Sequence, residues 1–298
     1  MDIKEAVRTC CANVSFDEPM KKHTSFKIGG NADIFCEPQN IKELGNLIKL
    51  FNENNTNYII FGNGSNVLVS DNGIRGAVIK IGDKMSKVNI CGERISADAG
   101  VLLSGLAKKA MREGLSGMEC LSGIPGSLGG AIYMNAGAYG VEIADILEEV
   151  TCILPNGEIL TLKKDELKFD YRKSVFMDNG GIITSCILRL KKADKEKIET
   201  DMAQITKRRV EKQPLELPSA GSTFKRPQGY FAGKLIEDCG LKGYSIGGAK
   251  ISEKHAGFVV NFDNATAADV MALIRYTQDK VYEKFGVKLE TEVKLYGF

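Results

Sequence analysis

The apolar positions between residues 40 and 54 recur at the spacing of one helix face. Asn40 stands at the start of this segment and Glu43 follows three positions later, a pair typical of a capping box at a helix N-terminus. The apolar residues of the segment are Ile41, Leu44, Leu47, Ile48 and Phe51. Because residues three and four positions apart share a helix face, the pattern predicts an amphipathic helix over residues 40–54 that packs on a sheet.

Short runs rich in β-branched residues follow this helix and predict strands. The runs cover residues 58–61, 67–69, 77–81, 88–91, 94–97 and 181–190. Residues 150–162 are apolar on both sides of Pro155-Asn156-Gly157, which predicts a hairpin around that turn. A second helix is predicted over residues 101–113, ending at Gly114. Residues 29–190 are therefore predicted to form an α+β region with two sheet segments.

The chain changes character after residue 190. Residues 192–213 are highly charged and carry Ile198, Met202 and Ile205 at helical spacing, and Pro214 and Pro218 end the pattern. This stretch indicates a boundary between domains.

A compact unit of about 85 residues is predicted beyond this boundary. It contains a helix over 231–239, a strand over 257–261, a helix over 267–285 capped by Thr266, and a last strand over 289–296. The expected buried stripe of the long helix consists of Val270, Leu273, Ile274, Val281 and Phe285.

The composition places the chain among folded proteins of ordinary surface charge. Its 298 residues exceed the ~250 to 300 at which one core usually divides, so more than one packed unit is expected. Hydrophobic residues make up 43% and charged residues 26%, which excludes disordered, collagenous and coiled-coil classes. A net charge of +2 is too small for a protein specialised for nucleic acid or an anionic membrane surface. Anion recognition must then be local.

The cysteines and histidines favour neither disulfides nor a metal. The eight cysteines are scattered through apolar runs without a CxxC pair, so we expect reduced core residues. His23 and His255 are not spaced like metal ligands, so no metal is expected. The first residues carry charges where a signal peptide is apolar, and no apolar run approaches ~20 residues. We therefore expect a cytoplasmic protein.

Glycine is over-represented, and the excess falls into three clusters. The chain has 32 glycines, about 11% against a usual ~7%. The clusters are Gly62-Asn-Gly-Ser-Asn66, Gly123-Ile-Pro-Gly-Ser-Leu-Gly-Gly130 and Gly137-Ala-Tyr-Gly140. Glycine lets backbone N–H groups converge on an anion such as a pyrophosphate. A plain tight turn explains the first cluster equally well, whereas the density of the second favours a ligand.

The familiar nucleotide-binding signatures do not fit these clusters. The P-loop pattern is absent, because Gly233-Lys234 continues with Leu235. The pair Gly62 and Gly64 runs into Val67 rather than a third glycine, so the dinucleotide fingerprint of the Rossmann fold is absent too. A dinucleotide must bind in another way.

Six motifs in this order resemble the UDP-N-acetylenolpyruvoylglucosamine reductase family. They are TSFKIGGNAD (24–33), GNGSN (62–66), GIPGSLGG (123–130), YRKS (171–174), AGSTFKRP (220–227) and EVKL (292–295). The resemblance covers about residues 20–297. It implies an enzyme that uses NADPH to reduce the enolpyruvyl ether of a UDP-sugar to UDP-N-acetylmuramate in peptidoglycan precursor synthesis.

The resemblance also implies a fold and a domain division. We expect an α+β protein whose FAD-binding domain, of the vanillyl-alcohol oxidase and p-cresol methylhydroxylase type, covers residues 1–195. Its two subdomains would cover roughly 1–95 and 96–195, and a C-terminal α+β substrate-binding domain would cover 196–298. The partners implied are the UDP-sugar and NADPH, with no nucleic acid, membrane or metal. Covalent flavin attachment lacks a matching histidine, so FAD is expected to bind noncovalently.

Site residues carried over by motif fall into three groups. The catalytic set is Arg172, Ser222 and Glu292, and the substrate-binding set is Tyr171, Lys225 and Arg226. The expected cofactor-binding residues are Gly62, Asn63, Gly64, Ser65, Asn66, Gly123, Pro125, Gly126, Ser127, Gly129, Gly130, Gly137 and Tyr139.

The catalytic roles agree with the chemistry of the implied reaction. Hydride transfer to the methylene carbon builds negative charge beside a carboxylate, which Arg172 would meet with a bidentate fork. Ser222 would donate the proton to the carbon that bears the carboxylate, and Glu292 would assist there. Taken without the resemblance, Arg172 reads as a surface ion pair, Ser222 as a helix cap and Glu292 as a solvated strand carboxylate.

Two departures and two alternatives stay open. An extra tyrosine-bearing loop found in some members has no room after Pro214, so the chain matches the shorter type, and Arg226 replaces an asparagine of other members. A flavin oxidase of the same fold acting on another alcohol or sugar would consume oxygen rapidly. A noncatalytic sugar-nucleotide-binding protein would hold no flavin.

Overall fold

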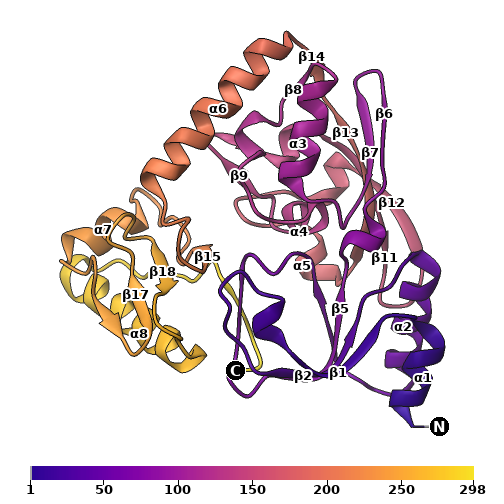
Figure 1. Cartoon of the computed structure of the whole chain (residues 1–298), viewed down its shortest axis with the longest axis horizontal. Helices are drawn as coiled ribbons and strands as arrows, with labels where there is room; N and C mark the ends of the chain where they lie inside the picture. Colours follow the sequence, from indigo (N-terminus) through magenta and orange to yellow (C-terminus); the bar gives the residue numbers. More distant parts are fainter. Residues whose placement is uncertain (1) are drawn as a thin grey trace. The chain divides into compact units, whose positions relative to one another are not determined.

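The computed structural model describes residues 2–298 (Figure 1). The chain divides into two compact units, each built from segments that are separate in the sequence. Unit 1 contains the described residues up to Phe16, Ile34–Asn63 and Gly76–Lys207, and unit 2 contains Asp17–Asp33, Gly64–Arg75 and Arg208–Phe298. The expected domains, residues 1–195 and 196–298, are continuous in sequence, whereas the two compact units interleave along the chain. The domain boundary at residues 195 and 196 therefore stays a prediction.

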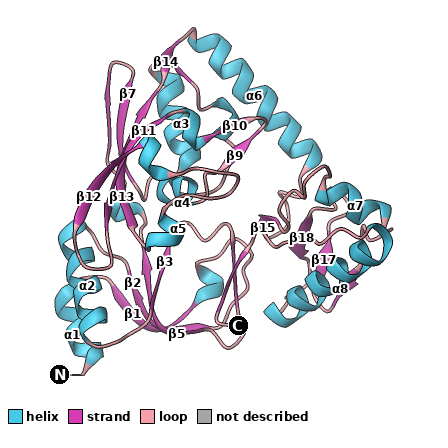
Figure 2. Ribbon diagram, turned by 180° about the vertical axis from the view of Figure 1, so that it is seen from behind, coloured by secondary structure: helices cyan, strands magenta, loops and turns pink. Residues whose placement is uncertain are grey.

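The N-terminal elements form two helices and a four-stranded sheet. The helices α1 (Ile3–Cys10) and α2 (Ile41–Glu53) lie side by side (Figures 1 and 2). The strands β1 (Val14–Pro19), β2 (Asn31–Cys36), β5 (Ile74–Lys80) and β3 (Tyr58–Phe61) follow one another in this order across the sheet. Within unit 1, β3 and β5 are parallel, with Tyr58 opposite Ala77.

The larger sheet of unit 1 is antiparallel throughout. Its strand order is β12 (Ile159–Lys163), β11 (Leu147–Ile153), β13 (Ile182–Arg189), β7 (Arg94–Asp98) and β6 (Val88–Cys91). The helices α3 (Leu103–Arg112) and α4 (Leu128–Tyr133) lie on one side of it (Figures 1 and 2). The remaining elements include the strand pairs β8 (Leu115–Ser116) with β14 (Lys191–Lys192) and β9 (Gly137–Ala138) with β10 (Val141–Glu142), together with α5 (Phe176–Asn179) and α6 (Lys195–Lys212).

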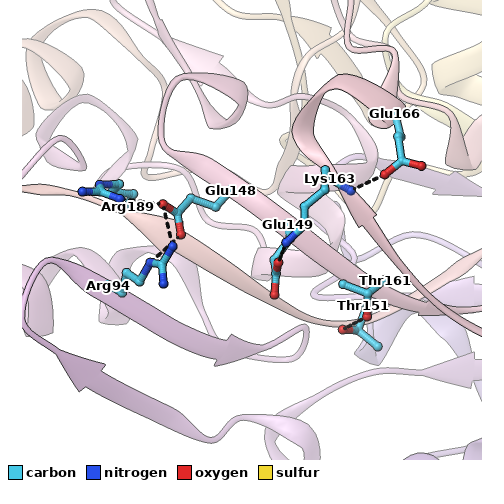
Figure 3. Close-up of polar contacts among 8 residues, drawn as sticks. All are labelled: Arg94, Glu148, Glu149, Thr151, Thr161, Lys163, Glu166 and Arg189. Carbon is cyan, nitrogen blue, oxygen red and sulfur yellow. Dashed lines mark hydrogen bonds and ion pairs between the residues drawn. The ribbon is translucent and has the colours of Figure 1, made fainter.

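Charged side chains cross-link the strands of this larger sheet (Figure 3). Glu148 on β11 pairs with Arg94 at 2.8 Å and with Arg189 at 3.2 Å, and so joins three strands. Burial raises the pKa of Glu148, but its hydrogen bonds to the two arginines outweigh that effect and the pKa is lowered. Lys163 pairs with Glu149 across the hairpin in the same way. These exposed pairs fix register more than they add stability.

Unit 2 contains a second sheet and two helices. Its strand order is β15 (Ser219–Ser222), β18 (Phe258–Asn261), β17 (Ala249–Ile251) and β16 (Ser245–Ile246), all antiparallel. The helices α7 (Ala232–Asp238) and α8 (Ala267–Phe285) contact each other, and α8 packs on β16 and β17. A separate parallel pair joins β4 (Val67–Val69) to β19 (Lys294–Tyr296), two segments far apart in the sequence.

Single-turn 3₁₀ segments connect these elements. They are Met20–Lys22, Asp83–Met85, Glu119–Leu121, Ile143–Asp145 and Lys164–Leu167.

Each unit has its own hydrophobic core. In unit 1, α2 buries Leu44, Leu47, Ile48 and Phe51 among the strands, as its apolar stripe predicts. In unit 2, α8 buries the apolar face that includes Val270 and Leu273. Burial of this kind stabilises by roughly 25 cal/mol per Å² of apolar surface, so the two cores are the main source of stability.

Most elements lie where the apolar pattern places them, but some details differ, among them Phe285, which is only partly buried, and Cys91, which is exposed rather than in the core. Ile41 was expected in the buried stripe of α2 but is 38% exposed, because it lies in the first turn. Glu43 accepts from the backbone N–H of Gln39 rather than that of Asn40, so the expected capping box is only half formed. The predicted strand over 289–296 is confined to Lys294–Tyr296.

Candidate active site

The first and second glycine clusters contact each other within unit 1. A Cβ atom on Gly62 would lie 2.2 Å from the Oγ of Ser127, and a Cβ on Gly129 would lie 2.8 Å from the Cβ of Ala99. The side-chain amide of Asn63 donates to the carbonyl of Pro125 at 2.5 Å. These positions require glycine, because a side chain there would collide with Ser127 or Ala99, and the glycines therefore form a surface of main chain. That surface fits the pyrophosphate of a dinucleotide.

The rest of the first cluster belongs to unit 2. Gly64 has φ +63°, and a Cβ there would lie 1.9 Å from the carbonyl oxygen of His23. The side-chain amide of Asn66 donates to the carbonyl of Glu292 at 3.2 Å, and the carbonyl of Asn66 accepts from the N–H of Lys294 at 3.0 Å. Asn66, expected as a cofactor ligand, therefore holds the segment that carries Glu292 and leads into β19.

Arg172 lies in a strained turn of unit 1. The N–H and C=O groups of Asp170 and Lys173 bond to each other at 3.2 and 3.0 Å, which makes Tyr171 and Arg172 the two central residues of the turn. Arg172 has φ +55°, a conformation that costs a non-glycine residue about 1 kcal/mol or more. Strain of this kind persists only where the surroundings impose it.

The guanidinium of Arg172 is held against the third glycine cluster. It donates to the carbonyl of Gly137 at 3.2 Å and to that of Asn135 at 3.5 Å, and its Nη1 lies 4.0 Å from the Oε1 of Glu142. The Tyr171 ring packs against the guanidinium with 4.9 Å between Cζ and the ring centroid. The side chain of Arg172 is only 16% exposed, so it does not form the surface ion pair that is expected when the family resemblance is left aside.

The third cluster itself forms a tight hairpin. Strands β9 and β10 pair Gly137 with Glu142, and the two turn residues between them, Tyr139 and Gly140, both have positive φ. Tyr139 is 48% exposed at the tip. The hairpin thus presents one aromatic side chain to solvent and one backbone carbonyl to Arg172.

Ser222 and Glu292 lie close together in unit 2. Ser222 ends β15 opposite Phe258 on β18, after a register shift at Gly221 with φ +76°. The following residue, Thr223, accepts the N–H of Glu292 on its carbonyl at 2.8 Å. Ser222 is therefore a strand residue and not a helix cap, and it lies beside the segment that carries Glu292.

The electrostatic setting of Glu292 is mixed. Burial lowers the pKa of the Lys294 ammonium, the charge of Lys225 lowers it further, and the Glu292 carboxylate acts in the opposite direction. Two cations and a carboxylate thus influence one another along this edge.

The expected substrate-binding residues of unit 2 come with two aromatics that sequence reasoning did not assign. Lys225 pairs with Glu290 at 3.0 Å, and the Arg226 guanidinium lies 4.0 Å from the centroid of the Phe231 ring. Phe231 is 63% exposed, and the neighbouring Tyr230 accepts a bond from Arg226 on its carbonyl. Two adjacent exposed aromatics before a helix are the sequence feature that could have indicated them.

His255 lies close to Thr223, the residue that follows Ser222. Its Nδ1 accepts the N–H of Gly257 at 3.1 Å, and the Gly257 carbonyl accepts the N–H of Thr223 at 2.8 Å. Burial disfavours the imidazolium, so the pKa of His255 is lowered. A neutral ring with its proton on Nε2 follows from these contacts.

An open cleft of about 510 Å³ in unit 2 contains none of the predicted site residues. Its lining includes Lys21, Lys27, Asp71, Asn261 and Asp263. Asp71 is already engaged, because its carboxylate accepts the first two N–H groups of α8, those of Ala267 and Ala268.

Most of the predicted residues form three groups, each within one unit, whereas Gly64, Ser65 and Asn66 of the first cluster lie in unit 2. Gly62 and Asn63 meet Gly123–Gly130, Tyr171 and Arg172 meet Gly137, and Ser222 lies with Glu292, Lys225 and Arg226. The first two groups lie in unit 1 and the third in unit 2.

The fold and the glycine surface define the class of protein. A model of the FAD binding domain matches residues 32–163. The structure of a berberine bridge enzyme variant superimposes with TM-score 0.52 at 16% identity, covering 65% of this chain and 44% of that one, which supports the fold alone. The chain is a flavoprotein of the FAD-binding fold expected from the sequence.

Comparison over the full chain identifies the family. A model described as the C-terminal domain of UDP-N-acetylenolpyruvoylglucosamine reductase matches residues 213–296. The UDP-N-acetylenolpyruvoylglucosamine reductase of Alkaliphilus oremlandii is 53% identical over 284 residues, 95% of this chain and 93% of that protein. The crystal structure of the reductase from Thermus caldophilus matches with TM-score 0.82 and 37% identity over 95% of this chain and 98% of that one. The chain belongs to the UDP-N-acetylenolpyruvoylglucosamine reductase family, and it is an FAD-containing oxidoreductase.

The homologue of Agathobacter rectalis is 51% identical over 294 residues. Within residues 2–298, no helix combines the length and the apolarity needed to cross a membrane.

Proposed function

We propose that this chain reduces UDP-N-acetyl-3-O-(1-carboxyvinyl)-glucosamine to UDP-N-acetylmuramate, with NADPH as the reductant and noncovalent FAD as the cofactor. The observation that carries the proposal is the presence of both family models in one chain, the FAD-binding model over 32–163 and the reductase-specific model over 213–296. Identity of 53% over nearly the whole length of a named reductase supports the same assignment.

The glycine surface of unit 1 would hold the pyrophosphate of FAD. At Gly62 and Gly129 a Cβ atom would collide with Ser127 and Ala99, so the two loops present main chain there, and the Asn63 amide ties the loops together. FAD, when bound there, supplies hydride transfer between NADPH and the enolpyruvyl group. The loops contribute binding and orientation, and the charge on the phosphates is met by backbone N–H groups.

Arg172 would bind the carboxylate of the enolpyruvyl group. Its guanidinium presents fixed N–H donors in a planar fork, and the same charge stabilises the negative charge that builds up beside the carboxylate in the transition state. Contacts with Gly137, Asn135 and the Tyr171 ring fix the orientation of the fork before substrate arrives. Such preorganisation removes the reorganisation cost at the moment of reaction.

Ser222 and Glu292 would manage the proton. The Ser222 hydroxyl donates a proton to the carbon that bears the carboxylate, so that the added hydride and proton together saturate the double bond. Glu292, whose N–H donates to the carbonyl of Thr223 beside Ser222, would assist at the same place and orient the substrate carboxylate. The UDP moiety would then meet the cationic group of Lys225 and Arg226, where the exposed aromatics of Tyr230 and Phe231 also lie.

The visible spectrum of the purified protein tests this function. We expect a yellow preparation whose flavin absorbance is lost on addition of NADPH and restored by the enolpyruvyl UDP-sugar without oxygen. A colourless protein that takes up no added FAD would contradict the proposal. Restoration by oxygen alone, with no response to the UDP-sugar, would instead identify an oxidase of the same fold.

A further inference from the structure

Asn135 is a buried residue at the end of α4 whose position no catalytic role explains. It is 1% exposed and has φ +41°, in the left-handed region. Its N–H donates to the carbonyl of Ile132 at 3.1 Å, which attaches it to the last turn of the helix. Asparagine tolerates this conformation better than most residues, but a buried amide needs a partner for each of its polar groups.

The side chain of Asn135 joins three separate segments of unit 1. Its amide nitrogen donates to the Oε2 of Glu142 at 2.7 Å and to the carbonyl of Asp170 at 3.2 Å. Its amide oxygen accepts the N–H of Ala144 at 3.1 Å. The end of α4, the segment after the glycine hairpin and the turn that carries Arg172 are therefore bonded through one side chain.

Both the backbone and the guanidinium of Arg172 depend on these contacts. The Asp170 carbonyl, which accepts from the Asn135 amide, begins the turn that forces Arg172 to a positive φ. The Asn135 carbonyl accepts from the Nη1 of Arg172 at 3.5 Å, and Glu142, held by the Asn135 amide, is the carboxylate 4.0 Å from the same nitrogen. Asn135 thus acts on the backbone, the guanidinium and the nearby charge of one residue.

We propose that Asn135 is a positioning residue that fixes Arg172, through the Asp170 turn and Glu142, in the orientation that binds the substrate carboxylate. This inference rests on the role proposed for Arg172. Displacement of about 1 Å in a group that contacts the reacting centre can cost on the order of 100-fold in rate. A residue that holds such a group should therefore influence turnover without touching substrate.

Asn135→Asp is the variant that tests the amide donor. Aspartate has the same shape and also tolerates a positive φ, so the backbone is preserved. The introduced carboxylate faces the Glu142 carboxylate and the Asp170 carbonyl, so two attractive contacts become repulsive. We expect kcat/KM for the enolpyruvyl substrate to fall ~10- to 100-fold, and calorimetry without NADPH to show weaker binding of that substrate. The rate at which NADPH bleaches the flavin should stay within about twofold of wild type.

Asn55→Asp is the matched control. Asn55 lies in the same unit, also has a positive φ of 50°, and is exposed. The same chemical change at that position should leave every one of these measurements unchanged. A comparable loss in Asn55→Asp would overturn the inference, because the effect would then come from added charge alone.

A second variant exchanges the two partners. In Asn135→Asp combined with Glu142→Gln, the amide and the carboxylate trade places and the donor–acceptor pair is restored. We expect this double variant to recover at least about tenfold of the lost kcat/KM. The single variant should also regain activity as the pH falls, because the pKa of the introduced carboxyl is raised by Glu142 and its protonated form donates again. Absence of both recoveries would contradict the assignment.

Coupling to Arg172 separates positioning from general structural support. If Asn135 acts through Arg172, then adding Asn135→Asp to Arg172→Lys should lower kcat/KM by less than about threefold further. Multiplying losses would show that Asn135 acts elsewhere, and equal slowing of flavin bleaching by NADPH would show a disturbed fold. Normal turnover in Arg172→Lys itself would instead defeat the role of Arg172, which distinguishes failure of the proposed function from failure of this inference.

Discussion

The two units fix their functional groups by different physical means. In unit 1, Arg172 lies in a turn with positive φ, and two backbone carbonyls and the buried Asn135 hold it there. In unit 2, Ser222 and Glu292 lie on extended segments whose register is set by ordinary ladder bonds such as that between Glu292 and Thr223. Unit 1 should therefore be sensitive to changes of backbone shape, and unit 2 to changes of side-chain chemistry.

The largest expected effect comes from a change of shape in unit 1. In Gly62→Val, the new Cβ atom would lie 2.2 Å from the Oγ of Ser127, and its two methyl groups would need further space. The loops must then move apart, so the glycine surface can no longer receive a pyrophosphate. We expect the purified variant to be colourless while its circular dichroism stays close to that of wild type. Absorbance of bound flavin per protein measures the effect.

Gly45→Val is the control for this change. Gly45 lies in α2, where a Cβ atom would have no neighbour within 4 Å. Its flavin content should be normal. Full flavin retention in Gly62→Val would show that the two loops do not form the cofactor surface.

The next largest effect comes from a change of chemistry in unit 2. Glu292→Gln keeps the backbone bonds to Thr223 and Asn66 but replaces the ionisable carboxyl group by a neutral amide. We expect kcat to fall by about 10³-fold with KM nearly unchanged, because the group acts mainly in the transition state. Steady-state kinetics against Glu283→Gln, an exposed carboxylate on α8, checks it. A rise in KM at constant kcat would reassign Glu292 to binding.

A smaller effect is expected at the N-terminus of α8 in unit 2, which lies outside the proposed catalytic groups. Asp269 accepts the N–H of Thr266 at 3.0 Å and that of Gly248 at 3.2 Å. The bond from Thr266 lowers the pKa of its carboxyl below the ordinary value, although burial opposes this. A carboxyl group whose pKa is lower in the folded state than in the unfolded state stabilises the folded protein at pH values above its unfolded-state pKa. This contribution is lost as the pH falls through the folded-state pKa. Asp269→Asn should cost about 1 kcal/mol at neutral pH and less in acid.

Urea unfolding at neutral and acidic pH measures this difference. Asp279→Asn, an exposed change on the same helix, should show neither the loss nor its pH dependence. An equal loss at both pH values would mean that the charge of Asp269 contributes nothing.

Local sequence signals account for the elements that were predicted well. The helix α8 begins at the Thr266 cap and ends at Gly286 in the left-handed conformation, so both ends and the apolar stripe can be recognised from the local sequence between these two residues. The hairpin of β11 and β12 is equally local. By contrast β1, with the sequence VSFDEP, alternates only from Val14 to Asp17 and was not predicted, and its strand pairs with β2.

What the sequence could not provide depends on contacts between distant segments. The interleaved units follow from pairings such as Lys294 with Val67, which no local pattern indicates. The motifs named the residues of the expected site, and the structure places Arg172 and the pair of Ser222 and Glu292 in different units. The position of Asn135 depends on three segments meeting, so one asparagine after a helix gave no indication of it.

Stopped-flow absorbance on Ser222→Ala tests the central claim most directly, because it separates the two halves of the reaction. Flavin bleaching by NADPH requires no proton donor at the substrate, so its rate should be close to that of wild type. Recovery of absorbance on adding the enolpyruvyl UDP-sugar requires that proton, and it should be slower by about 100-fold or more. Equal slowing of both phases would indicate a misplaced cofactor, and an unchanged second phase would contradict the role of Ser222 as the proton donor.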